Sequence, residues 1–264
     1  MINVFLLTDV EGIAGVDSIT QMDRKSPEYE NTRILLSNSI NKAVSACFEA
    51  NADKVYYLDG HGGGGNVIED LTDPRAQKCN LQEWVELLKS GSIDCQIELG
   101  AHARAGTING FLDHTVGSKT IFSIKINGIE MSETSLHAAL CGKFGVSVIA
   151  VTGDEATCRQ VKEYIPNCFT CAVKNATERN IATTYPDADE KMHDTIIAAI
   201  TNYKSVPLYQ VSEPLTVEET FYRTDICESA MRKEIAAFER IDARTLKKTV
   251  PVITGYGNLL FPSR

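Results

Sequence analysis

Four residues whose side chains can bind a metal ion stand just beyond apolar runs of this 264-residue sequence. They are Asp9, Glu11, His61 and His102. Two carboxylates with two imidazoles make a mixed oxygen and nitrogen ligand set that suits Zn²⁺, Mn²⁺, Co²⁺ or Fe²⁺. Asp9 and Glu11 are two residues apart, so in an extended segment both side chains point the same way. Each could then bind one ion, or one could bridge two. Spacing alone equally fits a solvated turn for the acidic pair and a structural role for each histidine.

Two further patterns resemble ligand sites but fit simpler structural roles. The four glycines at 62–65 lack the Lys-Ser/Thr ending of a phosphate-binding P-loop, so they predict a flexible loop. Cys168 and Cys171 form the one close pair among eight cysteines, whereas a zinc ribbon needs a second such pair. We therefore expect packed, reduced thiols.

Alternating strands and helices must bring the four ligand residues together. Short apolar runs predict strands, and apolar positions at helical spacing predict helices. The expected strands are 2–8, 54–58, 95–99, 121–126 and 146–151, and the expected helices are 28–50, 81–89, 133–143, 155–164 and 187–203. Strand–helix–strand order implies parallel strands with right-handed crossovers. The predicted fold class is therefore α/β, a mostly parallel sheet flanked by helices, with the four residues at its carboxyl edge, where such sheets bind ligands.

The sequence changes character beyond Pro207. A Thr-rich stretch at 216–224, a helical pattern at 226–238 and a strand pattern near 249–254 predict a smaller C-terminal α+β lobe. We accordingly expect a catalytic, metal-binding α/β domain at 1–207 and the lobe at 208–264. The sequence contains no internal repeats and no low-complexity segments.

Composition excludes several classes of protein. The formal net charge is −9, from 35 acidic and 26 basic residues, and no Lys/Arg cluster is present, so nucleic acid is not an expected partner. No apolar run is long enough to span a membrane, and the N-terminus lacks the basic region of a signal peptide. We therefore expect a cytoplasmic protein without a membrane partner and with free thiols.

Several motifs together resemble the D-aminopeptidase DppA family, the M55 metallopeptidases. The similarity covers about the first 175 residues and is weak in the C-terminal lobe. The matching segments are Thr8–Gly12, Asp59–His61, Gly100–Thr107, Gly110–Thr115, Asn127–Gly128, Ser132–Glu133, Val151–Asp154 and Ile165–Pro166.

The resemblance implies a dinuclear zinc centre and a catalytic histidine. Matched motif by motif, the metal ligands fall on Asp9, Glu11, His61, His102 and Glu133. The family's catalytic histidine falls on His114. Without the resemblance, Glu133 would be interpreted as an acidic residue in the first turn of a helix, where it favours the helix dipole. One position departs from the family motif, because Leu7 replaces a serine and cannot hydrogen-bond to the site.

Among three further polar residues, Arg104 and His137 have two interpretations each. Arg104, two residues past His102, could bind a substrate carboxylate or pair with an acidic side chain. His137 lies one helical turn after Glu133, so it could approach the site, although a buried, hydrogen-bonded core histidine is the favoured interpretation. His193, on a helix with charged neighbours, is expected at the surface.

The predicted function is two-metal amide hydrolysis. We expect two divalent ions per chain, zinc by resemblance, and a small peptide or amide substrate with a free N-terminus. The resemblance further implies a D-aminoacyl substrate and a closed homo-oligomer, a ring-shaped decamer in family members. The alternatives are a two-metal phosphoesterase, because the same ligands serve either electrophile, and a non-catalytic metal-binding member of the fold.

Overall fold

A seven-stranded sheet forms the centre of the larger lobe in the computed structural model, which describes residues 1–262. Its strand order is β3-β2-β1-β4-β7-β8-β9, and all neighbours are parallel except β8 and β9. The strands are β1 (Asn3–Thr8), β2 (Lys54–Asp59), β3 (Ala76–Cys79), β4 (Cys95–Ala101), β7 (Ser147–Asp154), β8 (Phe169–Glu178) and β9 (Ile181–Thr184). The predicted mostly parallel α/β fold is confirmed.

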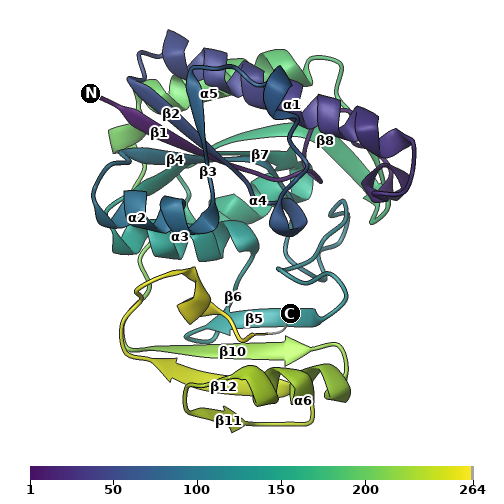
Figure 1. The fold of residues 1–264 in the computed structure, drawn as a ribbon, viewed down its shortest axis with the longest axis vertical. Helices are drawn as coiled ribbons and strands as arrows, with labels where there is room; N and C mark the ends of the chain where they lie inside the picture. Colours follow the sequence, from purple (N-terminus) through teal and green to yellow (C-terminus); the bar gives the residue numbers. More distant parts are fainter. Residues whose placement is uncertain (263–264) are drawn as a thin grey trace.

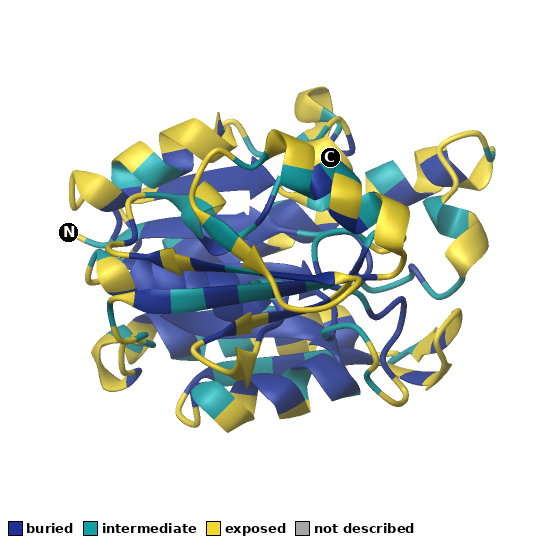
Figure 2. Cartoon of the chain, turned by 90° about the horizontal axis from the view of Figure 1, so that it is seen from below, coloured by how far each residue is buried: buried dark blue, intermediate teal, exposed yellow. Residues whose placement is uncertain are grey.

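Helices cover both faces of this sheet (Figure 1). One face carries α1 (Glu28–Glu49) and α5 (Ala188–Thr201), and the other carries α2 (Leu81–Lys89), α3 (Glu133–Lys143) and α4 (Glu155–Tyr164). Because both faces are covered, the central strands β1 and β4 are buried almost throughout. Figure 2, coloured by burial, shows buried strands in the interior of the molecule and helices whose outer faces are exposed.

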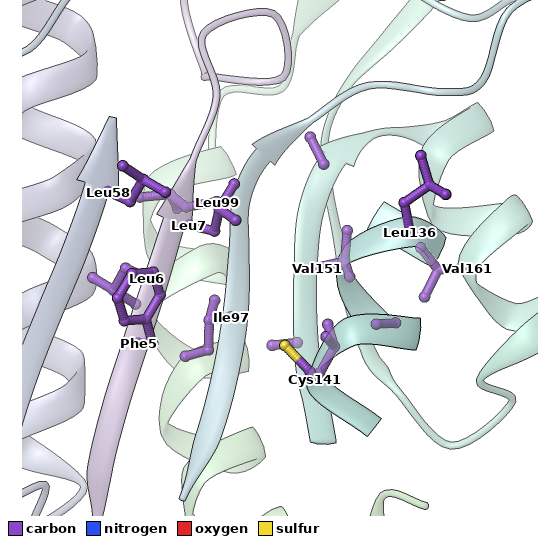
Figure 3. Packing of buried hydrophobic residues seen from close by; sticks show 14 of the residues in the cluster. Phe5, Leu6, Leu7, Leu58, Ile97, Leu99, Leu136, Cys141, Val151 and Val161 are labelled. Carbon is purple, nitrogen blue, oxygen red and sulfur yellow. The ribbon is translucent and has the colours of Figure 1, made fainter. Parts of the chain in front are cut away.

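The apolar core fixes the positions of the strand ends. Phe5 and Leu6 of β1 and Ile97 of β4 are fully buried, and Figure 3 shows them packed together beside the side chains of β7 and α3. A one-residue shift of β1 against β4 would turn these side chains to the opposite face, so the register is strongly specified. In the observed register Thr8 lies opposite Leu99, and the polar residues that follow the two strands therefore emerge side by side.

A second, antiparallel sheet forms the smaller lobe, with strand order β11-β12-β10-β5-β6. It comprises β5 (Ile121–Ile126), β6 (Ile129–Glu130), β10 (Leu215–Phe221), β11 (Phe238–Arg240) and β12 (Thr245–Val250), with α6 (Thr224–Lys233) packed against β10 and β12. The strand expected at 121–126 therefore belongs to this sheet. The division at residue 207 stays a prediction, but residues 208–264 do not build the smaller sheet alone.

Most expected elements are present within one or two residues, and the differences fall on short or polar strands. The sequence patterns did not predict β3, β6, β8, β9, β10 or β11. The helix expected at 226–238 runs over 224–233, and the strand expected near 249–254 is Thr245–Val250. β10 was missed because Thr and Glu residues alternate with its buried apolar residues, a pattern that marks a strand with one solvated face.

The burial of the cysteines agrees with the expectation from the sequence. All eight cysteines are free thiols, and seven of them, including Cys168 and Cys171, are buried. This confirms the packed-thiol interpretation of the close pair. Over the described residues, the structure contains no helix both long and apolar enough to cross a bilayer.

The buried Glu219 of β10 predicts how stability depends on pH. Burial raises the pKa of this carboxyl from 4.5 to about 8, against the opposing hydrogen bond from the backbone N–H of Phe261 and the charge of Lys248. The folded protein thus keeps a proton that the unfolded chain releases, so the stability contributed by Glu219 is lost as the pH rises from about 4.5 to 8. Glu219→Gln should therefore raise the free energy of unfolding at pH 8 by about 3 kcal/mol, and by less at pH 5.

Urea unfolding at the two pH values measures this effect. Glu218→Gln is the matched control, because Glu218 is the neighbouring residue of the same strand and its partner is the partly exposed Lys247. The control should retain the wild-type pH dependence. Equal pH dependence in Glu219→Gln and wild type would contradict the assignment.

Candidate metal centre

The five residues predicted as metal ligands converge at the carboxyl edge of the larger sheet. Asp9 and Glu11 follow β1, His61 follows β2 and His102 follows β4. Glu133 opens α3, whose N-terminus is capped by the side chain of Ser132. This cap starts the helix at the sheet edge and leaves the Glu133 carboxylate beside His102.

Two groups of potential ligand atoms lie at this edge. The first contains Asp9, Glu11 and His61, in which His61 Nδ1 lies 3.1 Å from Asp9 Oδ1 and 3.0 Å from Glu11 Oε2. The second contains His102, His114 and Glu133, in which Glu133 Oε1 lies 3.2 Å from His102 Nε2 and 3.6 Å from His114 Nε2. Within each group the ligand atoms lie within 4.8 Å of one another. Each group can therefore surround one cation.

Asp9 joins the two groups. Its Oδ1 faces His61, and its Oδ2 lies 3.3 Å from His102 Nε2. One carboxylate whose two oxygens face two neighbouring sites is the arrangement expected of a bridge between two cations. Of the two arrangements left open by the sequence, one ion on each acidic residue or one residue bridging two, these contacts favour the second, with Asp9 in the bridging position.

The protonation of the site shows that it attracts positive charge. Burial alone would lower the pKa of His61, but the charge of Glu11 and the hydrogen bond to Asp9 raise it to about 11. The pKa of His102 is likewise raised, because the charges of Glu133 and Asp9 outweigh burial. Burial alone would raise the pKa of Asp9, but the close approach of the His102 and His61 rings holds it well below its usual range. The carboxylates thus keep protons on imidazoles that metal ions would replace.

A buried nitrogen of His102 gives the second indication that these residues fit a metal. Its Nε2 is fully buried and lies 3.3 Å from Asp9 Oδ2 and 3.2 Å from Glu133 Oε1, yet among the described residues it makes no hydrogen bond of acceptable geometry. A buried polar atom without such a bond is costly, and coordination would satisfy it. Its Nδ1 is directed at the backbone oxygen of Ala103, at 3.0 Å, which fixes the ring and leaves Nε2 facing the carboxylates.

His114, a member of the second group, lies in a strained loop. Its ring stacks on that of His102 with centroids 3.9 Å apart, and its Nδ1 lies 2.8 Å from the carbonyl oxygen of Leu112. A proton on Nδ1 is donated to that carbonyl, so Nε2 keeps its lone pair on the side of Glu133. Leu112 and Val116 have φ angles of 50° and 62°, in the left-handed region that bulky residues avoid.

The strained backbone at Val116 directs a hydrogen-bond donor at the site. The backbone N–H of Val116 donates a hydrogen bond of 2.7 Å to Glu133 Oε1, the same oxygen that faces His102 and His114. Residues held in unfavourable backbone conformations cluster at functional sites, where the surrounding structure over-determines them. The loop therefore positions His114 and Glu133 together.

Close backbone packing holds Glu11 in place and gives a testable prediction. A Cβ at Gly12 would lie 2.2 Å from the carbonyl oxygen of Ala101, so no other residue fits without moving the loop. Gly12→Ala should displace Glu11 from His61, lower the free energy of unfolding by about 1–3 kcal/mol and reduce metal retention. Gly255→Ala is the control, because its Cβ would have no neighbour nearer than 3.9 Å. Elemental analysis and urea unfolding give the comparison, and a Gly12→Ala protein with wild-type metal content would contradict it.

A cavity of about 1050 Å³ opens onto the candidate metal centre. Asp9, His102 and Glu133 line it from the larger lobe, and Tyr256 and Phe261 line it from the chain end. The cavity is large enough for a short peptide. Its position gives the smaller lobe a role that the sequence did not indicate, which is to supply one wall of the site.

The structure shows where the three other polar residues considered from the sequence lie, which are Arg104, His137 and His193. Arg104 lies 3.7 Å from Glu130 and 3.5 Å from Glu163, so it pairs with acidic side chains. His137 is buried and bonded to Glu98, as expected of a core histidine, yet it also lines the cavity. His193 is partly exposed and lies 3.2 Å from Glu49.

Sequence reasoning missed three residues that shape the site. They are Glu98, Val116 and Tyr256. Only Glu98 carried a signal, since it is a carboxylate within a buried strand. The positive φ of Val116 and the return of Tyr256 to the cavity depend on tertiary contacts.

A mostly parallel α/β sheet with two adjoining ligand groups at its carboxyl edge defines a class of protein that can hold paired metal ions. Within that class, the sequence profile of the M55 peptidase family, described as D-aminopeptidase, matches residues 2–256. The chain therefore belongs to the M55 D-aminopeptidase family.

The chain is similar in sequence to a D-aminopeptidase and in fold to a solved structure. A D-aminopeptidase of Bacillus subtilis (strain 168) is 28% identical over 183 residues, which are 67% of this chain and 65% of that protein's length. The solved structure described as the Zn-dependent D-aminopeptidase DppA from Bacillus subtilis, a self-compartmentalizing protease, superimposes with a TM-score of 0.91. It is 22% identical, and the superposition covers 98% of this chain and 95% of the other. At that identity the superposition establishes the shared fold.

Proposed function

We propose that this protein is a two-metal aminopeptidase that removes an N-terminal residue, with D-aminoacyl peptides or amides as its substrates. The observation that carries the proposal is Asp9, whose two oxygens face two separate groups of ligand atoms. Family membership supports peptide hydrolysis, and the names of both relatives support the D-aminoacyl preference. Zinc is the metal we propose, because the related structure is described as Zn-dependent and the ligand set suits it.

The ligand residues and His114 divide the chemical work. Two divalent ions held by Asp9, Glu11, His61, His102 and Glu133 would depress the pKa of bound water and polarise the substrate carbonyl. Glu133 and His102 are fixed by the Val116 N–H and the Ala103 carbonyl, so neither needs to reorganise during the reaction. His114 presents Nε2 to the same space and can accept a proton there and return it to the departing amine.

The acidic lining of the site suits a substrate with a free N-terminus. Asp9 and Glu133 line the cavity, and an ammonium group would be stabilised beside these carboxylates. A substrate whose amine is acetylated loses this interaction. We therefore expect turnover of D-aminoacyl amides and no turnover of their N-acetyl derivatives.

A substrate screen with the zinc-loaded protein tests the proposed function. The set comprises D- and L-alanyl-p-nitroanilide, N-acetyl-D-alanyl-p-nitroanilide and p-nitrophenyl phosphate, all of which release a coloured product. Turnover of the D-alanyl compound above the others supports the proposal. Hydrolysis of the phosphate ester alone would establish the phosphoesterase alternative, and bound metal without turnover of any compound would indicate a non-catalytic member.

We also propose that the chain assembles into a closed homo-oligomer, a ring of ten subunits, in the cytoplasm. The description of the related structure as a self-compartmentalizing protease supports assembly, and the free thiols suit a reducing compartment. Light scattering coupled to size exclusion measures the assembly. A mass of about 29 kDa, the mass of one chain, would contradict it.

A further inference from the structure

A buried pair of charged residues, Glu98 and His137, lies beside the candidate metal centre without belonging to it. Glu98 on β4 and His137 on α3 are 2% and 8% exposed, and His137 Nδ1 lies 3.1 Å from Glu98 Oε2. The other oxygen of Glu98 accepts a hydrogen bond of 2.6 Å from Gln96 Nε2, and Gln96 in turn accepts one from the indole N–H of Trp84. Both carboxylate oxygens are thus held in place.

Stability does not explain why this pair is charged. Removing a carboxylate and an imidazolium from water costs several kcal/mol each, and well-packed apolar residues of similar size are often at least as stable. Every residue of β4 is buried, and the His137 ring packs against those of Trp84 and Tyr256. A polar network at such a position is therefore a candidate for a binding role.

The position of His137 connects the pair to the reaction site. His137 follows Glu133 by four residues on α3, so the two side chains share a face about 5–6 Å apart, and both line the cavity. Its ring packs edge-on against Trp84, at a centroid distance of 5.6 Å, and against Tyr256 at 5.2 Å. The ring is therefore held in one orientation at the cavity wall.

The free nitrogen of His137 faces the cavity. Among the described residues no group hydrogen-bonds to Nε2 of His137. This atom is not fully buried, and because His137 lines the cavity, Nε2 is accessible from it. Burial alone would lower the pKa of His137, but the charge and hydrogen bond of Glu98 outweigh burial and raise it. The contact of Nδ1 with the Glu98 carboxylate favours the imidazolium form, in which Nε2 carries a proton that it can donate.

We propose that His137, held by Glu98, binds the carboxylate of the residue that follows the scissile bond, so that the enzyme prefers dipeptides with a free C-terminus. The inference rests on the proposed aminopeptidase function. One residue of extended chain spans about 3.3–3.6 Å, so a dipeptide bound at the metal centre would place its carboxylate about one helical turn away, near His137. A carboxylate is the substrate group that forms the strongest hydrogen bond with an imidazolium.

The test compares D-alanylglycine with D-alanylglycinamide, which lacks only the terminal charge. Wild-type protein loaded with zinc should cleave the free acid with a kcat/KM at least about tenfold higher, the effect of one charge-assisted hydrogen bond. His137→Gln should reduce this ratio to about one. His193→Gln is the matched control, because His193 also lies on a helix and pairs with a glutamate but is distant from the cavity lining. It should keep the wild-type ratio.

Several outcomes would overturn the inference. A wild-type ratio near one would do so, as would a His137→Gln protein in which both substrates slow equally. If His137→Gln loses its circular dichroism spectrum, Glu98→Gln replaces it and should lower the same ratio. If the wild type cleaves neither dipeptide, the proposed function fails, and calorimetry then decides the inference separately. If wild-type protein binds D-alanylglycine more tightly than D-alanylglycinamide, and His137→Gln loses this difference, the inference is supported. Equal binding of the two compounds, or binding of neither, refutes it.

Discussion

Asp9→Asn is expected to lower the metal content of the protein from two divalent ions per chain to one at most. Asn keeps the size of the side chain but removes its charge and leaves a single carbonyl oxygen, so it cannot face both His61 and His102 as Asp9 does. Two-metal sites supply several kcal/mol of transition-state stabilisation, and each 1.36 kcal/mol is tenfold in rate. The variant should therefore lose about 10³-fold in kcat/KM on a D-alanyl amide.

Elemental analysis after zinc reconstitution measures the metal content, and initial rates measure the activity. Asp225→Asn is a suitable control, since it removes one formal charge from an exposed ion pair of the smaller lobe. It should retain two ions and full activity. A wild-type protein that binds one ion, or an Asp9→Asn protein that binds two, would show that Asp9 does not bridge a pair.

His114→Ala should have the opposite profile, with the metals retained and activity lost. The five proposed ligand residues do not include His114. Its Nε2 lies 3.6 Å from Glu133 Oε1, farther than the 3.2 Å of His102 Nε2. Removal of a general acid–base group typically lowers the rate by 10²–10⁴-fold, so we expect kcat to fall by about 10²-fold or more. The same metal analysis and rate measurement apply.

His193→Ala controls for the loss of an imidazole at a site distant from the cavity. Loss of one metal ion from His114→Ala would make His114 a ligand, a role that its place in the second ligand group also allows. Full kcat in the variant would remove it from the mechanism. The two substitutions, Asp9→Asn and His114→Ala, therefore separate metal binding from proton transfer.

The sequence by itself determined the α/β class, the order of the central elements and the ligand residues that follow strands. Apolar runs at 2–8, 54–58 and 95–99 are buried on both faces, and this burial is a local property of composition. Because parallel strands share one carboxyl edge, the proximity of Asp9, His61 and His102 followed from the same pattern. Glu133 and His114 followed only from family resemblance. They lie beside the other candidate ligands through tertiary contacts, which the spacing of residues along the sequence does not reveal. The roles of all these residues remain predictions.

The tertiary structure alone decided how the smaller lobe is built and what surrounds the metal ligands. Residues 121–130 join β10 across about ninety residues of chain, and no local pattern specifies which distant strand a half-buried strand will pair with. Likewise, the positive φ of Val116 is imposed by the packing that directs its N–H to Glu133. Glu98 was visible as a carboxylate in a buried strand, but its partner His137 lies 39 residues away on a helix. Periodicity reports which face of an element is buried, whereas pairings between elements depend on the summed contacts of the folded chain.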